Sequence, residues 1–213
     1  MMYWFNYFFE KINIFFSKAS SNPNTPNLVL FPYSPFKIKC CDVGEDHNLL
    51  IDYDNQLWVW GGNNKGQLGL GHKENIIFPI KNENFPKNIK LKSAKARYNT
   101  SATVSDCGKV FFWPIERDNE FYTKPIELLF PYKTCITSVS LGFNFSIFLT
   151  NAGLVYSMGA ENNEGQLGHG DLKIRNSPTL IESLRNSGDK ITSVECGFKH
   201  SIAKSSLGKV NLK

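Results

Sequence analysis

The sequence predicts an all-β protein, a partial β-propeller preceded by a short amphipathic helix, and three observations predict it. The tetrapeptide Gly-Gln-Leu-Gly occurs at 66–69 and again at 165–168. A pattern of spaced positions recurs four times, anchored on Gly44, Arg97, Gly142 and Gly197. Two short apolar runs separated by a turn follow the anchors. Units of about 50 residues with several short strands indicate propeller blades, which bury their faces only against neighbouring blades.

Residues 1–18 do not follow the repeat and are predicted to form an amphipathic helix. Aromatic and apolar residues recur there at helical spacing, namely Trp4, Phe5, Phe8, Phe9, Ile12, Phe15 and Phe16. The run is too short to span a bilayer and lacks the features of a signal peptide. Three interpretations stay open: packing onto the propeller or a partner, contact with a membrane interface or a targeting role, and mis-annotated sequence. Residues 19–35, rich in Pro, Asn and Ser, are predicted to be a linker.

The repeat pattern divides the remaining chain into units at about 36–88, 89–133, 134–188 and 189–213. The residue six positions before each anchor is always apolar, as is the residue thirteen positions after it. Within each unit, the first apolar run lies at 49–51, 102–104, 147–149 and 202–203, and in the first three units a second lies at 57–60, 110–113 and 154–156. Such pairs of runs predict β-hairpins.

The turn of each predicted hairpin has one shared position, occupied by Asn55, Gly108, Gly153 and Gly208. Glycine adopts positive φ without steric cost, and asparagine tolerates it better than most residues. We therefore expect a left-handed backbone at this position in all four hairpins. The glycine-rich segment that follows, 60–71 in the first unit, predicts tight bends whose backbone groups bond to Asn and Gln amides.

These patterns resemble the repeat of the regulator of chromosome condensation family, which reads I-x-x-I/V-x-x-G-x-x-H-S, a hairpin, then V-x-x-W-G-x-N-x-x-G-Q-L-G. Segment 191–201 resembles the first half and segment 60–69 the second. The resemblance extends from about residue 36 to the C-terminus and implies blades of a seven-bladed propeller. The repeat-defining residues that it marks as structural are Gly44, His47, Trp60, Gly61, Asn63, Gly66, Gln67, Leu68, Gly69, Gly108, Trp113, Gly142, Gly153, Gly159, Asn162, Gly165, Gln166, Leu167, Gly168, Gly197, His200 and Gly208.

The second and fourth units depart from this pattern. In the second unit Arg97 and Thr100 replace the Gly and His, Pro114 replaces a glycine, and Gly-Gln-Leu-Gly is missing. The fourth unit stops at Lys213, before its Trp-Gly position. Four units cannot close a seven-bladed ring. We therefore expect further C-terminal repeats or a second chain to complete it.

Composition points to a mildly basic chain with a net charge of +5. The densest basic stretch, a candidate contact surface, comprises Lys87, Lys90, Lys92, Lys95 and Arg97. It suits phosphates or an acidic partner, or it is an edge strand that lysines protect from pairing. No aromatic-interleaved RNA motif accompanies it, so a nucleic-acid partner is not expected. The five cysteines contain no Cys-x-x-Cys, which favours a reducing compartment, the cytoplasm or nucleus, over a disulfide framework or zinc site.

No constellation of catalytic, cofactor-binding or metal-binding residues is evident, so neither enzymatic activity nor a cofactor is predicted. The sequence predicts a non-enzymatic protein-interaction module whose partner is another protein. The resemblance implies an alternative, a guanine-nucleotide exchange factor for a Ran-like small GTPase, which works by binding the nucleotide-free state best. A chromatin-associated role is a third, weaker alternative. Membrane contact through the N-terminal segment stays open.

Overall fold

The structure is a computed structural model that describes residues 37–86, 88–117, 120–131 and 134–212. The expected N-terminal helix at 1–18, the linker at 19–35 and Lys87 lie outside the described residues.

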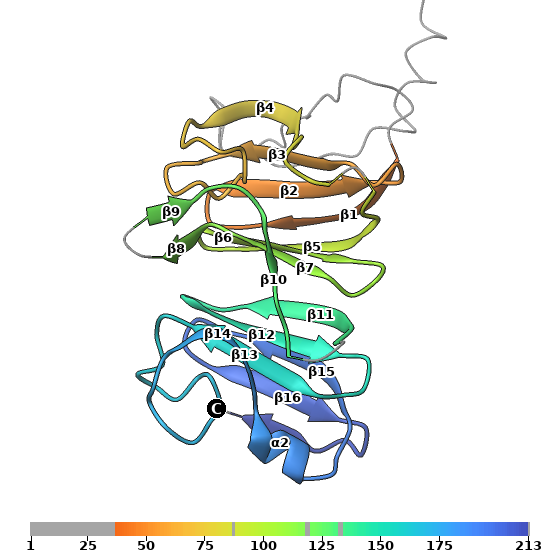
Figure 1. Cartoon of the computed structure of the whole chain (residues 1–213), viewed down its shortest axis with the longest axis vertical. Coiled ribbons are helices and arrows are strands. Elements are labelled where there is room, and N and C mark those ends of the chain that lie inside the picture. The colour runs from red at the N-terminus through yellow and green to blue at the C-terminus, as the bar shows by residue number, and fades with distance from the viewer. Residues whose placement is uncertain (1–36, 87, 118–119, 132–133, 213) are drawn as a thin grey trace, which may run out of the picture.

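Four antiparallel sheets follow one another along the chain, and we number them as blades 1 to 4 (Figure 1). Blade 1 consists of β1 (Ile38–Val43), β2 (His47–Asp52), β3 (Leu57–Gly61) and β4 (Ile76–Lys81). Blade 2 consists of β5 (Leu91–Arg97), β6 (Thr100–Ser105), β7 (Val110–Trp113) and β10 (Ile126–Leu128). Blade 3 consists of β11 (Ile136–Leu141), β12 (Phe145–Thr150), β13 (Val155–Gly159) and β14 (Arg175–Leu180). Blade 4 consists of β15 (Ile191–Cys196), β16 (Ser201–Ser205) and β17 (Val210–Leu212). The predicted partial propeller is therefore confirmed.

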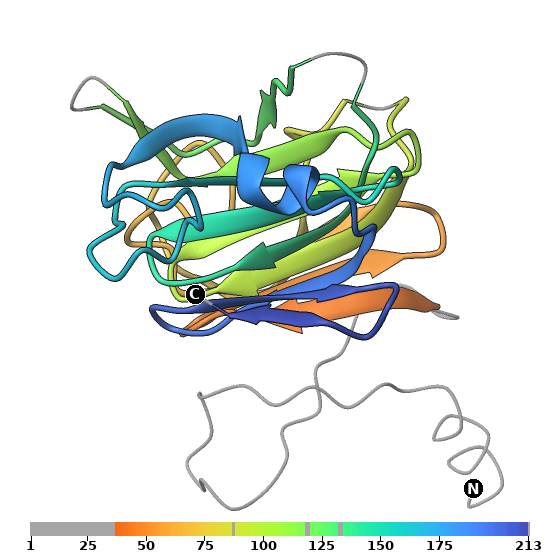
Figure 2. The same cartoon turned by 90° about the horizontal axis from the view of Figure 1, so that it is seen from below.

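Two further elements lie outside the blades. A separate hairpin of β8 (Ile115–Arg117) and β9 (Glu120–Tyr122) is inserted between β7 and β10. It projects from the side of the blades (Figure 2) and occupies the place in the second unit where Gly-Gln-Leu-Gly is missing. The short helix α2 (Glu182–Asn186) connects blade 3 to blade 4.

The predicted hairpins are present in all four blades, and their turns have the expected backbone. The shared turn residues have positive φ, at 61° for Asn55, 80° for Gly108, 83° for Gly153 and 76° for Gly208. The first strand of every blade also carries a β-bulge at the same place, for example between Ile38 and Cys40. A bulge increases the local twist of a strand.

The core lies between the blades. Side chains alternate along β2 and β3, so that Leu49 and Val59 face blade 2 while Leu50 and Trp58 face the opposite way. One apolar cluster joins blades 1 and 2, a second joins blades 2 and 3, and a third joins blades 3 and 4. Stacked blades thus bury faces that a single sheet would leave in water.

The two ends of the strands form two distinct faces. Successive first strands contact one another, β1 with β5, β5 with β11, and β11 with β15. The turns that leave these strands, at 44–46, 97–99, 142–144 and 197–199, come together at one end, which we call the loop face. The hairpin turns at 52–56, 105–109, 150–154 and 205–209 lie at the other end, which we call the hairpin face.

Candidate interaction surface

Two buried asparagines hold the glycine-rich loops in shape. The Asn63 amide donates to the carbonyl oxygens of His72 (2.9 Å) and Glu74 (3.0 Å), and its oxygen accepts from the Leu68 N–H (2.9 Å). Asn162 makes the same three bonds in blade 3, at 3.0, 2.9 and 3.0 Å, to Asp171, Lys173 and Leu167. A fully buried amide with both ends bonded fixes the loop around it.

The Gly-Gln-Leu-Gly segments connect blade 1 to blade 2 and blade 3 to blade 4. The Gln67 carbonyl accepts from the Ser101 hydroxyl (2.7 Å) and from the Trp113 indole (2.8 Å), both in blade 2. His47 Nε2 lies 2.8 Å from Ser101 Oγ, and because the hydroxyl gives its one hydrogen to Gln67, the ring is the donor. Ser201 of blade 4 likewise donates to the carbonyl of Gln166 of blade 3 (2.9 Å).

Burial of His47 lowers its pKa to about 4, although the nearby Asp46 carboxylate acts in the opposite direction. The ring is therefore neutral at neutral pH, and its position against Ser101 gives it a structural role between blades. His200, at the same repeat position in blade 4, is exposed.

The glycine at the anchor position is required by the ring three residues later. A Cβ at Gly44 would overlap the His47 ring, and a Cβ at Gly142 would overlap the Phe145 ring. In the second unit the residue at the ring position is Thr100, and the anchor is Arg97. The glycine and the ring are therefore lost together.

Three aromatic rings from successive blades meet at the loop face, and we call them the axial aromatic cluster. Phe143 and Phe198 are stacked, with centroids 4.6 Å apart and planes 19° apart. Tyr98 meets both edge-on at 5.3 Å. Each ring directly follows the repeat anchor, where blade 1 has Glu45 instead. Phe198 is 46% exposed and the other two are partly exposed, so the cluster is accessible.

The backbone of this cluster is tightly specified. Tyr98 has a φ of 48°, which a bulky side chain rarely adopts. Its carbonyl accepts from the Glu45 N–H at 3.0 Å, and the Phe198 carbonyl accepts from the Phe143 N–H at 3.0 Å. Non-glycine residues in this region persist where the surroundings determine the conformation, and they are concentrated at functional sites.

The described residues of the basic stretch are spread along β5, between the two faces of the molecule. Arg97 lies at the loop face, with its guanidinium carbon 5.6 Å from the centre of the Tyr98 ring. Lys90 lies at the start of β5, where its carbonyl accepts from Asp106 at the hairpin face. At roughly 3.3 Å per residue, the Cα atoms of Lys90 and Arg97 are about 20 Å apart along the strand. Lys92 is exposed and Lys95 half-buried between them.

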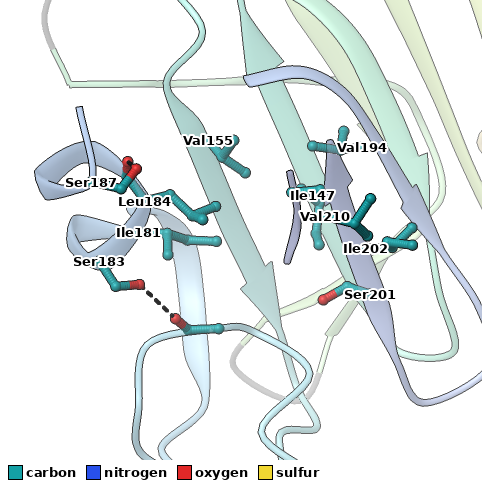
Figure 3. A pocket seen from close by; sticks show the side chains of 12 residues that line it. Ile147, Val155, Ile181, Ser183, Leu184, Ser187, Val194, Ser201, Ile202 and Val210 are labelled. Atoms are coloured by element: carbon teal, nitrogen blue, oxygen red, sulfur yellow. Dashed lines mark hydrogen bonds between the residues drawn. The ribbon is translucent and has the colours of Figure 1, made fainter. Parts of the chain in front are cut away.

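A pocket of about 420 Å³ opens between blade 3, α2 and blade 4 (Figure 3). Its walls are mainly aliphatic, from Ile147, Val155, Ile181, Leu184 and Val194, and their side chains point into it. Serine hydroxyls are the polar side-chain groups in its wall, and one of them, Ser183, donates to the Gly168 carbonyl at 3.5 Å. The lining contains no acid, histidine, cysteine or lysine, so it offers no proton-transfer chemistry.

In the part of the chain that the structure describes, His, Cys, Asp and Glu side chains form no group of three that could hold a metal ion. No helix among the described residues is long and apolar enough to cross a membrane. The cysteines are free thiols, and burial raises the pKa of Cys196 to about 12.

The sequence pattern pointed to the repeat-defining residues and did not identify the axial aromatic cluster. A signal was present, because the residue after each anchor is Glu45, Tyr98, Phe143 and Phe198 in turn. Only the packing of the blades shows that these positions converge.

Comparison with known proteins agrees with this architecture. Two family models match the chain, and both are described as Regulator of chromosome condensation (RCC1) repeat. The first matches residues 54–103 and 152–203. The second matches residues 38–67 and 136–166. The mouse secretion-regulating guanine nucleotide exchange factor is 35% identical over 72% of this chain and 34% of its own length. The Arabidopsis thaliana ultraviolet-B receptor UVR8 is 31% identical over 82% of this chain and 40% of its own length.

Among solved structures, Prp20p from Saccharomyces cerevisiae superimposes with a TM-score of 0.73 at 21% identity, over 93% of this chain and 50% of that one. The chain therefore spans less than half the length of the two curated relatives and about half of this structural neighbour. The repeat matches, the four blades and the shared interblade contacts agree, and the chain belongs to the family of regulator of chromosome condensation (RCC1) repeat proteins.

Proposed function

We propose that this chain is a non-enzymatic protein-interaction module that contacts its partner protein through the loop face. The axial aromatic cluster is the observation that carries the proposal. Aromatic residues and arginine are enriched at the centres of protein interfaces, where a few such side chains contribute most of the binding energy. Tyr98, Phe143, Phe198 and Arg97 present this combination on one face.

The geometry of the cluster supports binding rather than simple exposure of apolar side chains. Three rings fixed by mutual contact lose little conformational entropy when a partner covers them. The Arg97 guanidinium beside Tyr98 adds a charged donor at the edge of the apolar surface. Gln67 and Trp113 of the repeat are engaged in contacts between blades, and Asn63 is engaged within its own loop, so we expect recognition at the turns that vary between units.

The test compares two exposed apolar side chains of blade 4. Phe198→Ala removes a ring of the cluster, whereas Leu207→Ala removes an exposed side chain from the hairpin face. Proteins captured from the source cells by the full chain are quantified for both variants and the parent. We expect partners to be lost with Phe198→Ala and kept with Leu207→Ala, both variants melting near the parent. Equal capture by all three proteins would contradict the proposal.

Exchange-factor activity is the second candidate, because the 35% identical mouse relative is named as an exchange factor. The Prp20p structure is also titled with its binding to Gsp1p and histones. In this candidate the loop face would bind a Ran-like small GTPase. The full chain should then bind the nucleotide-free GTPase far more tightly than the loaded form and should accelerate release of a fluorescent guanine nucleotide. Equal affinity for both forms would exclude it.

A further inference from the structure

The glutamines of the two Gly-Gln-Leu-Gly segments, Gln67 and Gln166, hold equivalent places at two junctions between blades, and both are buried. At the junction of blades 1 and 2, the Gln67 amide is bonded at both ends. Its oxygen accepts from the Lys65 N–H at 2.9 Å. Its nitrogen donates to the Asp46 carboxylate at 3.0 Å and to the Asn99 side-chain oxygen at 3.1 Å. Both acceptors belong to turns of the loop face, each two residues after a repeat anchor.

At the junction of blades 3 and 4, the Gln166 amide is bonded at one end only. Its oxygen accepts from the Glu164 N–H at 3.0 Å, which is the bond that Gln67 also makes and which distinguishes the two ends of the amide. Its nitrogen is buried and has no hydrogen-bond partner among the described residues. The residue in the place of Asp46 is Asn144, which is exposed and has a φ of 57°. Buried donors are almost always paired in folded proteins, so this one indicates an acceptor from outside the chain.

The residue in the place of Asn99 is Lys199, so an acceptor has been replaced by a cation. A lysine ammonium only donates. Lys199 Nζ lies 3.2 Å from Glu161 Oε1, and the lysine side chain is 41% exposed. Since Gln67 reaches Asn99, the equivalent Gln166 and Lys199 belong to one corner of the loop face. This corner offers two donors, one neutral and buried, the other charged and exposed.

We propose that this corner, which we call the carboxylate site, binds an acidic side chain of the partner protein. The inference rests on the loop-face interaction proposed above. The partner's carboxylate accepts from the Gln166 amide, as Asp46 does from Gln67, and pairs with the Lys199 ammonium. One carboxylate can do both, because it has two acceptor oxygens. The ammonium favours an anion over a neutral carbonyl, since bonds between charged groups are the stronger. Because the Gln166 nitrogen is buried, binding requires the Lys199 side chain to move away from Glu161.

The surroundings of the carboxylate site specify what else the partner must carry. Phe198 of the axial aromatic cluster directly precedes Lys199, and consecutive Cα atoms are about 3.8 Å apart. The corresponding turn of blade 1 carries Glu45 and Asp46, whose like charge disfavours a carboxylate there. The partner segment therefore has an acidic residue beside an apolar one, and it lies with the acid over blade 4.

The test uses acetate as the probe, because it is a carboxylate without the rest of a partner. The full chain is titrated with sodium acetate in exchange for sodium chloride at constant ionic strength. The side-chain amide signals of Gln166 and Gln67 are followed by nuclear magnetic resonance. We expect a saturable shift of the Gln166 signal. The Gln67 signal should not move, because its own chain already supplies a carboxylate.

Three variants separate the site from general attraction of anions. Lys199→Asn removes the cation and copies Asn99, and it should lose the acetate response. Lys204→Asn removes another exposed lysine of blade 4 and should keep the response. Glu161→Gln removes the group that competes for Lys199 and should respond at lower acetate concentrations. Equal shifts of the two glutamine signals, or an unchanged response in Lys199→Asn, would overturn the inference.

The capture assay with Phe198→Ala separates this inference from the proposed function. Loss of the captured partners with Lys199→Asn as well as with Phe198→Ala supports the carboxylate site. Loss with Phe198→Ala alone would mean that the site holds an adventitious ion only, which overturns the inference and leaves the interaction module intact. Partners kept by Phe198→Ala would instead contradict the loop-face proposal, whatever the acetate titration shows.

Discussion

Replacing Ser101 with alanine tests the interblade contact that we regard as most specific. The hydroxyl of Ser101 donates to the Gln67 carbonyl at 2.7 Å and accepts from His47 Nε2 at 2.8 Å. Ser101 and His47 are buried, so water cannot readily replace the missing hydroxyl. Ser101→Ala should therefore affect two groups differently.

The two groups contribute unequal losses. The Gln67 carbonyl keeps its bond from the Trp113 indole at 2.8 Å, so losing the hydroxyl there costs about 1 kcal/mol. His47 Nε2 keeps no partner for its N–H, and an orphaned buried donor costs about 1–3 kcal/mol. We expect Ser101→Ala to lower the free energy of unfolding by about 3 kcal/mol, or the melting temperature by roughly 9 °C for a chain of this size.

The blade 3–4 junction provides the matched background. There Phe145 takes the place of His47, and Ser201 donates to the Gln166 carbonyl alone. In a His47→Phe chain, which copies that arrangement, Ser101→Ala leaves no histidine unpaired and should cost only about 1 kcal/mol. The difference between backgrounds is the coupling energy of the His47–Ser101 pair.

Urea unfolding followed by circular dichroism measures all four proteins of this cycle. Ser206→Ala, at an exposed position in the last hairpin turn, is the control and should change stability by less than about 0.5 kcal/mol. A coupling energy below about 0.5 kcal/mol would refute the reasoning, because it would show that the histidine loses nothing when the hydroxyl is removed.

Three further predictions concern the Asn162 loop, the anchor glycine Gly142 and the buried His47. Asn162→Ala removes three hydrogen bonds and should lower the free energy of unfolding by about 3 kcal/mol. The amides of residues 159–174 should also exchange faster with solvent. An unchanged exchange rate would mean that other contacts fix the conformation of this loop. Gly142→Ala should lower the melting temperature, because the new Cβ overlaps the Phe145 ring. Adding Phe145→Thr to this variant should restore part of the lost melting temperature. No recovery would contradict the link between the anchor glycine and the ring. Between pH 6.5 and 4, His47 is protonated in the unfolded chain but stays neutral in the folded chain. The free energy of unfolding should therefore fall by up to about 3 kcal/mol as the pH decreases through this range. In urea unfolding across this pH range, the free energy of unfolding should decline less steeply for His47→Phe than for the parent. Parallel declines for the two proteins would contradict the lowered pKa of His47.

The hairpins were predictable from sequence because their determinants are local. A short apolar run predicts a strand, and a residue that tolerates positive φ predicts the turn a few positions away. Asn55 shows how far this extends, since it occupies a glycine position of the repeat and has a φ of 61°. The four blades follow because each unit repeats the same local signals.

The environment of each side chain was not predictable in this way, because the neighbouring blade determines it. His47 and His200 occupy the same repeat position, yet one is buried against Ser101 and the other is exposed. Ser101 follows Gln67 by 34 residues, and only the packing of two blades brings them together. The axial aromatic cluster likewise requires three turns, 45 and 55 residues apart, to meet at one end of the stack.

The second unit shows that departures from the repeat can be physically linked. It lacks both the histidine position and the Gly-Gln-Leu-Gly segment, which are the two parts that blade 1 uses to hold blade 2. At the junction of blades 2 and 3, Phe130 packs edge-on against Phe148 and Tyr156, at 5.2 and 5.6 Å. Phe85 packs in the same way against Phe111 and Trp113 at the junction of blades 1 and 2, at 5.2 and 5.7 Å.

The segment that replaces the missing loop also turns back towards blade 1, where the Gly71 N–H donates to the Thr123 carbonyl at 3.2 Å. Without a ring at position 100 the anchor no longer has to be glycine, and Arg97 can occupy it beside Tyr98. The junction of blades 2 and 3 thus has the aromatic packing of the first junction without the hydrogen bonds of a histidine, a serine and a Gly-Gln-Leu-Gly carbonyl. The anchor position of blade 2 therefore carries the arginine of the candidate interaction surface.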